Sequence, residues 1–409
     1  MKKKADIIDL INNGENSFVE FKTEKVDNAK LAKEMVAFAN SRGGTLLIGV
    51  EDNGQIVGIS ALQLEQRIMN IASSSIYLSI IPLYYELLID ENNKIAVVEI
   101  EQGINKPYCY NREGKTHYYI RFGSESRIAT RDQLQRLFQA SGIVHFELKP
   151  VFGSTITDLD MELVENFCFY HRHIDLNSLT KDEQINFLTN MQLLTLEENK
   201  ICATVAGLLL FGRDPKRFLY QAGISMVRYK GVEKSYDYVK REIRKPAISK
   251  QDKNTLKILV DGSIDEAVRF VSEQIPQKAG LQGARREVQY AYPMDSVREA
   301  IVNAVAHRDY TIAGADISVD IFDDRLEIKS PGKIPNTLTI EKKKIGTKYY
   351  RNQLMVDYLA EAGYMDKNSL GIPLKILKLC REYTGKEPLL EELGEELKVV
   401  LYPREDIGM

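Results

Sequence analysis

The clearest helical pattern of the chain lies near its N-terminus. Leu31, Met35 and Phe38 recur at helical spacing and predict a helix over residues 27–41 with one buried face. Asp27 is a suitable N-cap for this helix. The double glycine at residues 43–44 is a strong stop signal, because glycine accepts the left-handed geometry of a helix C-cap.

Short apolar runs on both sides of this helix predict strands. They lie at residues 19–21, 45–50, 84–89, 95–100 and 116–121. Asp52-Asn53-Gly54 supplies the residue types of a tight turn, and further helices are predicted at residues 61–73 and from Thr130 onwards. We therefore expect an α+β domain with a mixed sheet over residues 1–145.

Residues 146–290 read as a connecting segment of helices and strands. Two helices are predicted at residues 158–169 and 180–193, the second opened by a capping box of Thr180 and Glu183, and an apolar run at residues 203–211 is interpreted as a strand. These elements could form a small winged-helix-like unit, or they could support the next domain by packing, which we favour. Residues 228–253 mix Lys and Arg with tyrosines, as single-stranded nucleic-acid surfaces do, but interspersed acids favour a solvated surface.

The C-terminal segment, residues 291–409, contains a helical phrase from Arg298 to Tyr310. Glu299, Asn303 and His307 follow one another at intervals of four residues and share one helix face, while the apolar positions between them point into a core. Polar groups at a buried edge cost free energy unless they are satisfied, so this stripe indicates function. A hairpin is predicted at residues 317–329, and a closing strand at residues 397–402.

Composition narrows the functional classes. The 409 residues contain 44% hydrophobic and 28% charged residues, as expected for a globular protein of two or three domains, and the net charge of −3 requires any nucleic-acid surface to be local. The sequence shows no signal peptide and no apolar run long enough to span a bilayer. Four scattered cysteines argue against disulfides and structural zinc, so we expect a cytoplasmic protein.

Three carboxylates of the first domain are candidate metal ligands. Glu15, Glu20 and Asp52 flank the predicted strand–helix–strand unit, and hard oxygen ligands on such a unit can hold Mg²⁺ or Mn²⁺ for phosphodiester chemistry. Alternatively, Glu20 is the solvated side of an ordinary strand and Asp52 is a turn residue. Lys22, Arg121 and Arg127 are candidate phosphate contacts, or else solvated surface charges.

The phrases that carry these carboxylates resemble a known family. Glu15-x-x-x-x-Glu20-Phe21-Lys22, the Ala-Phe-Ala-Asn-x-x-Gly-Gly helix end and Ile-Gly-Val-Glu-Asp52-Asn-Gly are similar to the Schlafen AlbA-type domain, over most of residues 10–140. Some members are metal-dependent endoribonucleases that use two Glu and one Asp, which implies a catalytic and metal-binding role for Glu15, Glu20 and Asp52. Many bacterial members are described only as DNA-binding.

The C-terminal segment resembles the Bergerat (GHKL) nucleotide-binding fold, an α/β sandwich found beside Schlafen AlbA-type domains in predicted bacterial transcriptional regulators. The helix phrase matches its Glu-x-x-x-Asn box, which implies Glu299 as the base and Asn303 as the Mg²⁺ ligand. The same resemblance implies further nucleotide-binding positions at His307, Arg308, Asp309, Gly332 and Gly371.

Two departures from that fold's pattern are visible in the sequence. Ser330 stands where an acidic or amide residue usually reads the adenine amino group, and Ser369-Leu370-Gly371 stands where a Gly-x-Gly lid usually wraps the phosphates. There is no P-loop phrase. We therefore expect nucleotide binding, with ATP turnover left open and a domain kept for packing or dimerisation as the alternative.

The leading functional hypothesis combines the two resemblances. We expect a nucleotide-responsive nucleic-acid-binding protein with Mg or Mn and ATP as cofactors, which cuts RNA or single-stranded DNA as a metal-dependent nuclease in phage defence or stress. The rival hypothesis is a non-enzymatic DNA-binding transcriptional regulator with an ATP-binding sensor. The resemblance further implies a homodimer. A promoter-reading winged helix after the nucleotide-binding domain is not expected.

Overall fold

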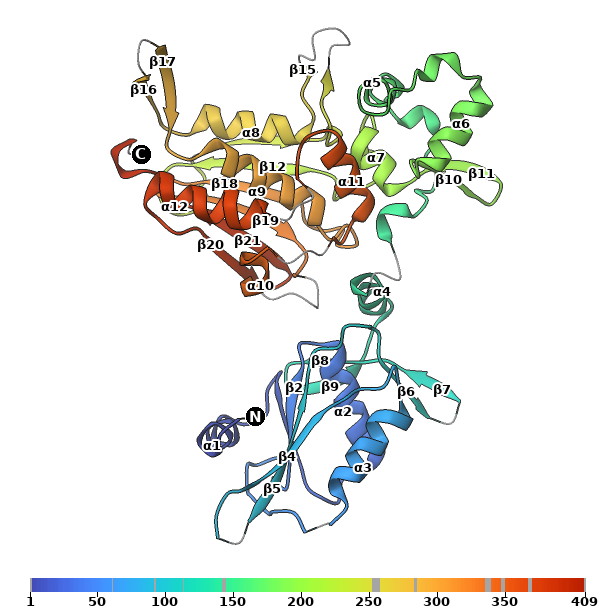
Figure 1. Cartoon of the computed structure of the whole chain (residues 1–409), viewed down its shortest axis with the longest axis vertical. Coiled ribbons are helices and arrows are strands. Elements are labelled where there is room, and N and C mark those ends of the chain that lie inside the picture. The colour runs from blue at the N-terminus through green and yellow to red at the C-terminus, as the bar shows by residue number, and fades with distance from the viewer. Residues whose placement is uncertain are drawn as a thin grey trace. The chain divides into compact units, whose positions relative to one another are not determined.

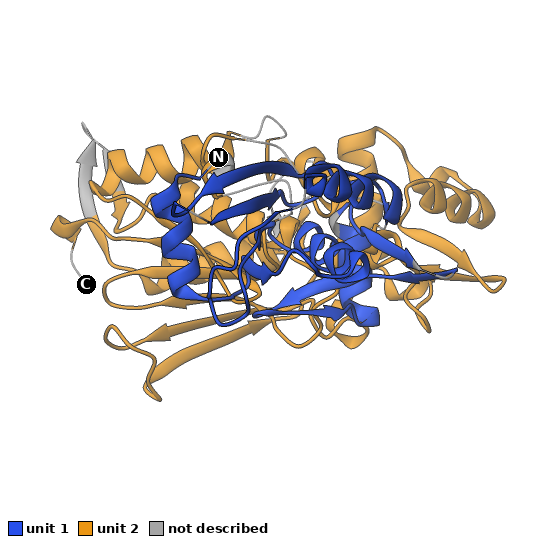
Figure 2. Ribbon diagram, turned by 90° about the horizontal axis from the view of Figure 1, so that it is seen from below, with its two compact units in different colours: residues 1–144 blue, residues 145–409 orange. Residues whose placement is uncertain are grey.

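The computed structural model describes residues 2–60, 62–91, 93–112, 114–141, 145–251, 258–282, 285–334, 340–346, 350–366 and 370–407 (Figure 1). The chain divides into two compact units, residues 1–144 and 145–409, which we name unit 1 and unit 2 (Figure 2). None of the helices in the described ranges combines the length and the hydrophobicity that a membrane-spanning helix needs.

Unit 1 is a mixed arrangement of helices and short strands. Its elements are α1 (Lys4–Asn13), β1 (Val19–Lys22), α2 (Asn28–Asn40), β2 (Gly44–Ile48), α3 (Leu64–Asn70), β3 (Ile76–Tyr77), β4 (Leu83–Leu88), β5 (Lys94–Ile100), β6 (Cys109–Arg112), β7 (Lys115–His117), β8 (Tyr119–Phe122), β9 (Glu125–Ile128) and α4 (Arg131–Ala140).

The main sheet of unit 1 has the strand order β1-β2-β5-β4. β1 and β2 run parallel, whereas β2, β5 and β4 pair antiparallel. Because side chains alternate along a strand, the sheet supports two hydrophobic clusters. Leu46 and Ile48 pack with α2 and α3 on one face, while Phe21 and Leu47 pack with α1 on the other (Figure 1).

Unit 2 carries more elements around one core. They are α5 (Met161–Arg172), α6 (Lys181–Asn190), β10 (Leu194–Glu197), β11 (Lys200–Ala203), α7 (Val205–Phe211), β12 (Ile224–Tyr229), β13 (Tyr238–Ile243), β14 (Lys250–Gln251), β15 (Ile258–Val260), α8 (Ser263–Gln274), β16 (Gln277–Gln282), β17 (Arg285–Tyr290), α9 (Met294–His307), β18 (Ile317–Ile321), β19 (Leu326–Pro331), α10 (Ile340–Lys344), α11 (Gln353–Glu361), α12 (Leu379–Thr384), β20 (Leu389–Leu393) and β21 (Glu396–Leu401).

A six-stranded sheet organises unit 2, with the order β13-β12-β18-β19-β21-β20. β12 pairs in parallel with β18, and the other neighbours are antiparallel. α8 and α9 contact each other and cover one face of this sheet (Figure 1). The predicted division at residues 290/291 therefore falls inside one compact unit, and strands from both sides of it share one sheet.

The predicted fold class, α+β with mixed sheets, is confirmed. The interpretation of residues 203–211 as a strand was wrong, because Val205–Phe211 forms helix α7, with the Thr204 side chain accepting a hydrogen bond from the Gly207 amide. A fully buried apolar run has no polar face, so its pattern does not separate helix from strand. The strand expected at residues 116–121 is divided between β7 and β8.

Candidate functional site

Glu15 and Glu20 lie together at β1, an edge strand of the main sheet. Glu20 and Lys22 alternate with the core residues Val19 and Phe21, so they face the α2 side of the sheet. Glu15 lies in the turn before β1, and its Oε1 accepts a hydrogen bond of 2.8 Å from the Phe21 amide. The edge position of β1 leaves that amide available, because β1 has only β2 as its sheet neighbour.

Both carboxylate oxygens of Glu20 are paired with cations. The Lys22 Nζ atom lies 2.5 Å from Glu20 Oε1, and the Arg121 Nη1 atom lies 2.7 Å from Glu20 Oε2. The same Lys22 Nζ atom is 3.8 Å from Glu15 Oε1. Lys22 therefore stands between the two glutamates that the sequence suggested as metal ligands.

Arg121 is a buried member of this group rather than a surface residue. Its side chain is 2% exposed, and its Nη1 atom is also 2.9 Å from Oε2 of Glu34 on α2. The Nη2 atom donates to the Asn16 carbonyl at 2.6 Å, and the guanidinium lies over the Phe38 ring. We name Glu15, Glu20, Lys22, Glu34 and Arg121 the N-terminal ion cluster.

The charges of the cluster shift the pKa values of two of its members. Burial and the negative charges of Glu20 and Asp52 raise the pKa of Glu15 against the opposing effects of the Phe21 amide and Lys22. Burial alone would lower the pKa of Lys22, but its hydrogen bond to Glu20 and the charges of the neighbouring glutamates together raise it. Lys22 therefore keeps its proton and its positive charge.

Asp52 lies in the turn after β2, as predicted, where the Gly54 amide donates to the Glu51 carbonyl. Its charge acts on Glu15, so these two carboxylates share an electrostatic environment. Among the described residues, however, no group of three or more His, Cys, Asp or Glu side chains is placed to hold a metal ion. The oxygen ligands have the right chemistry for Mg²⁺ or Mn²⁺, but those of Glu20 are already paired with Lys22 and Arg121.

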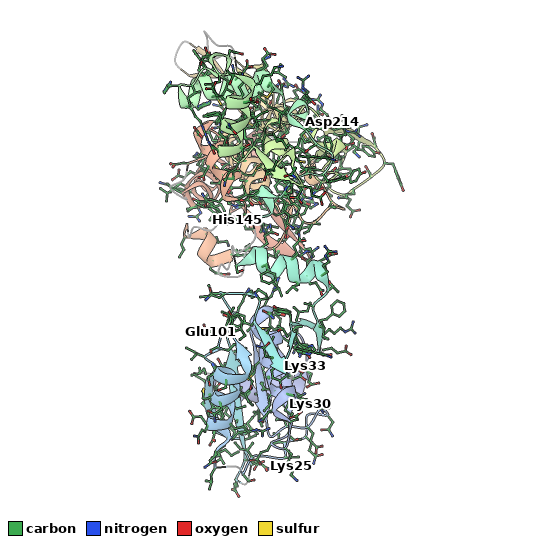
Figure 3. All side chains as sticks on the ribbon, turned by 90° about the vertical axis from the view of Figure 1, so that its right-hand side faces the viewer. Lys25, Lys30, Lys33, Glu101, His145 and Asp214 are labelled. Atoms are coloured by element: carbon green, nitrogen blue, oxygen red, sulfur yellow. The ribbon has the colours of Figure 1, made fainter. Side chains whose placement is uncertain are left out.

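Arg127, the remaining candidate phosphate contact, is exposed. Its guanidinium lies over the exposed ring of Phe122, 4.8 Å from the ring centroid, and pairs with Glu125 on the same β8–β9 hairpin. The hairpin contacts α2. Lys25, Lys30 and Lys33, which we name the α2 lysine row, follow one another along this helix and the loop before it (Figure 3).

In unit 2, Glu299 and Asn303 form a pair on α9. Asn303 Nδ2 donates to the backbone carbonyl of Glu299 at 2.7 Å and to its Oε1 atom at 2.8 Å. Glu299 is buried, and its Oε2 lies 3.4 Å from Lys375 Nζ. Because Nδ2 is committed to Glu299, the amide oxygen of Asn303 is the atom that can ligate Mg²⁺.

A pocket opens beside this helix. It encloses about 40 Å³ and is lined mainly by apolar side chains, with Asn303, His307, Ser330, Lys333 and Arg351 as its polar members. A single water needs roughly 10–15 Å³ of such space, so the pocket holds only a few waters in this state. Binding of a nucleotide would require it to widen.

The other predicted nucleotide-binding residues differ in position. Gly332 lines the pocket, and a side chain there would overlap Arg351 and Asp309. Arg308 is fully buried and donates to the backbone carbonyls of Asp309, Ile312 and Ala315. Its place is therefore inside the fold rather than in the pocket, and burial lowers its pKa.

Asp309, Ser330 and Gly371 each make close contacts with neighbouring residues. Asp309 accepts hydrogen bonds from the amide and hydroxyl of Thr311, and Ser330 Oγ donates to the Ala304 carbonyl at 2.8 Å. Gly371 lies so close to Glu299 that an added Cβ atom would overlap the carboxylate. Ser369, the first residue of the predicted lid phrase, lies outside the described residues.

Sequence reasoning gave no site role to three functional candidates. Glu34 lies on the apolar face of α2, between Leu31 and Phe38, and a charged residue on such a face is the signal that could have revealed it. Lys333 and Arg351 line the pocket, and Arg351 Nη1 donates to the His307 carbonyl at 2.9 Å. Their positions depend on long-range contacts that the local pattern does not contain.

Two known domain families match the chain. The family "Schlafen, AlbA_2" matches residues 15–130, and the family "Putative ATP-dependent DNA helicase recG C-terminal" matches residues 314–401. The first range contains Glu15, Glu20, Asp52 and the remaining residues of the N-terminal ion cluster. The second contains β18 to β21 and begins after α9.

Similar solved structures are distant in sequence. The DIP2311 protein from Corynebacterium diphtheriae is 19% identical, with 98% of this chain and 80% of that chain covered and a TM-score of 0.43. The N-terminal domain of a RecG-related protein from Nitrosomonas europaea is 22% identical, with 32% of this chain and 95% of that chain covered and a TM-score of 0.26. No curated protein matches the chain.

The two matched ranges and the described geometry agree with the architecture expected from the sequence. The N-terminal family is related to nucleic-acid functions and the C-terminal family is ATPase-related, which indicates nucleotide binding. Residues 15–130 of the chain are therefore similar to the Schlafen AlbA_2 family, and residues 314–401 are similar to the RecG C-terminal, ATPase-related family.

Proposed function

We propose that this protein is a nucleotide-responsive nucleic-acid-binding protein, in which unit 1 binds RNA or DNA and unit 2 binds ATP with Mg²⁺. The observation that carries the proposal is the pairing of the buried Glu299 with the half-buried Asn303 on α9, beside a pocket whose polar edge includes two cations, Lys333 and Arg351. The pairing of this pocket with a Schlafen AlbA_2 domain supports the nucleic-acid part.

Different residues of the pocket would bind different parts of the nucleotide. Apolar side chains such as Ile328 and Ile376 provide a surface for the base, and Lys333 and Arg351 carry the positive charge that phosphates need. The Asn303 amide oxygen would ligate Mg²⁺, which neutralises phosphate charge when bound. Glu299, held by Asn303 and Lys375, would orient an attacking water.

On unit 1, the α2 lysine row and the β8–β9 hairpin support nucleic-acid binding. Lys25 and Lys30 form no ion pair among the described residues, so their charges are available to phosphates. The exposed Phe122 ring with Arg127 over it offers a surface on which a base can stack. Affinity should therefore fall as salt rises.

A test of this surface compares two charge reversals of equal size. Lys30→Glu should weaken binding of labelled tRNA, single-stranded DNA or duplex DNA, while Lys181→Glu on α6 of unit 2 should leave it near the wild-type value. Fluorescence anisotropy at several salt concentrations measures both. Equal affinities of the two variants for every nucleic acid would remove the α2 side from the proposal.

A second candidate function is metal-dependent cleavage by Glu15, Glu20 and Asp52. The observation that favours it is the shared electrostatics of these carboxylates, since the charges of Glu20 and Asp52 both raise the pKa of Glu15. Wild type and Glu20→Ala should be incubated with the same nucleic acids and Mn²⁺ or EDTA. Equal product from both proteins, or none from either, would leave nucleic-acid binding without cleavage.

Calorimetry tests the nucleotide pocket separately. Wild type should bind a non-hydrolysable ATP analogue with Mg²⁺, and Asn303→Ala should lose the Mg²⁺-dependent part of the binding. Asn190→Ala, an exposed asparagine at the end of α6, is the matched control. Absence of Mg²⁺-dependent heat in wild type would refute nucleotide binding. Homodimerisation, implied by the resemblance to the Bergerat fold, stays a prediction for sedimentation analysis.

A further inference from the structure

The Lys22 ammonium occupies the position between Glu15 and Glu20 that a shared cation would take. Its Nζ atom lies 2.5 Å from Glu20 Oε1 and 3.8 Å from Glu15 Oε1, and it also donates to the Phe21 carbonyl at 2.6 Å. The position is thus surrounded by oxygen atoms from three residues. Oxygen-rich surroundings of this kind suit a hard metal ion equally well.

The charges around this position are close to balance, with one carboxylate in excess when Asp52, whose charge also acts on Glu15, is counted. Glu15, Glu20 and Glu34 supply three carboxylates, and Lys22, Arg121 and Lys33 supply three cations, with Lys33 Nζ lying 3.6 Å from Glu34 Oε1. A divalent ion placed among them without loss of a cation would add two positive charges beside Lys22 and Arg121. Like charges at this distance repel strongly in a half-buried site.

Of the two cations paired with Glu20, Lys22 is the one that can leave. Arg121 is held by Glu20, Glu34, the Asn16 carbonyl and the Phe38 ring, and its side chain is buried. The Lys22 side chain is 17% exposed and ends in a compact ammonium on a flexible stem, which water solvates well. Movement of Lys22 into solvent would free one oxygen of Glu20, whereas Glu15 Oε1 would keep its hydrogen bond from the Phe21 amide.

We propose that the Lys22 ammonium is the resident cation of Glu15 and Glu20, and that a divalent metal ion binds these carboxylates only by displacing it. The proposal rests on the metal-binding part of the second candidate function. It goes beyond that function because it assigns Lys22 as the residue that sets the metal affinity. The wild-type protein should accordingly bind divalent metal weakly.

Titration of the full chain with Mn²⁺ alone, followed by electron paramagnetic resonance of the free ion, tests the competition. Lys22→Met keeps the apolar stem and removes the charge. The variant protein should bind Mn²⁺ at least about tenfold more tightly than wild type. The reason is that an opposite charge in contact with a carboxylate shifts its binding equilibrium by about one to three orders of magnitude. Lys4→Met, an exposed position on α1 of the same unit, should match wild type.

Two further variants control for misfolding and for the site at which Mn²⁺ binds. Lys22→Gln is the replacement if Lys22→Met fails to fold, and adding Glu20→Gln to either should abolish the gain. Equal Mn²⁺ affinity of the Lys22 variants and wild type, or no binding by any of them, would overturn the proposal. Because neither nucleic acid nor nucleotide is present, failure of the nucleic-acid proposal would leave this result unchanged.

Discussion

At the scale of single residues, Arg121 illustrates how a predicted surface contact can become part of the fold. The sequence offered it as a phosphate ligand, but the structure surrounds its guanidinium with Glu20, Glu34 and Ser126. Any phosphate would have to displace carboxylates that are themselves buried. Its main effect is therefore to join the β8–β9 hairpin to β1 and α2.

Removal of Arg121 should destabilise unit 1 strongly. Arg121→Met leaves Glu20 and Glu34 without this partner, and breaking a buried ion pair in this way costs about 3–5 kcal/mol. Arg127→Met removes an exposed pair with Glu125 and should change stability by no more than about 1 kcal/mol. Chemical denaturation of both variants measures the difference, and equal losses would contradict the assigned role of Arg121.

Lys106 gives unit 1 a dependence of stability on pH. Its Nζ atom donates to the Asn40 and Ser41 carbonyls at the end of α2, and burial lowers its pKa to about 7. In the unfolded chain the ordinary pKa is about 10.4, so between these values the unfolded state binds a proton that the folded state lacks. Stability should therefore rise as the pH increases from about 7 to about 9.

Lys106→Met should remove this contribution. The denaturation midpoint of wild type, measured across that pH range, should rise relative to that of the variant, because only the wild type carries the Lys106 titration. Two curves that stay parallel would show that Lys106 keeps its proton in the folded protein.

At the scale of elements, close packing of Gly371 against α9 links the Gly371–Lys378 segment to the pocket beside α9. The Lys375 carbonyl accepts a hydrogen bond from Ser296, and Lys375 Nζ pairs with Glu299. Ile372 and Ile376 of the same segment line the pocket. The segment and α9 therefore define the pocket width together.

Gly371→Ala should disturb this arrangement. The new Cβ atom would overlap the Glu299 carboxylate, and such overpacking typically costs about 1–3 kcal/mol. We expect lower thermal stability and weaker binding of Mg²⁺ with the ATP analogue. Gly314→Ala is the control, because the space around Gly314 is open. Unchanged nucleotide affinity in Gly371→Ala would separate this segment from the pocket.

The elements also show what sequence patterns can and cannot reveal. Asp27 and the Thr180–Glu183 capping box were predictable, because caps act between residues two or three positions apart. Helix α7 was not, since burial on every side removes the periodic contrast. The contact between Glu34 and Arg121 spans 87 residues, and the position of Lys22 between two glutamates depends on the turn before β1.

At the scale of the whole molecule, separate cores predict separate responses to ligand. The hydrophobic clusters of unit 1 and the large cluster of unit 2 contain residues from their own unit only. Binding of Mg²⁺ and ATP should therefore raise the unfolding temperature of unit 2, with a stabilisation of about 2.7 kcal/mol at a ligand concentration 100 times Kd.

Differential scanning calorimetry of the full chain checks this expectation. Two transitions should appear, and only one should move with nucleotide, while Asn303→Ala should keep both transitions without the shift. A single transition that moves as a whole would indicate that the two cores unfold together.

The parallel pairing of β12 with β18 limits how this protein can be dissected. β12 and β13 precede residue 291, yet they form one side of the sheet that also contains the RecG-type range. A fragment starting at residue 291 would expose the unpaired backbone of an apolar central strand, which promotes aggregation. A loss of nucleotide binding in such a fragment would report the missing strand, so the boundary for cloning and for interpreting deletion phenotypes lies near residue 145.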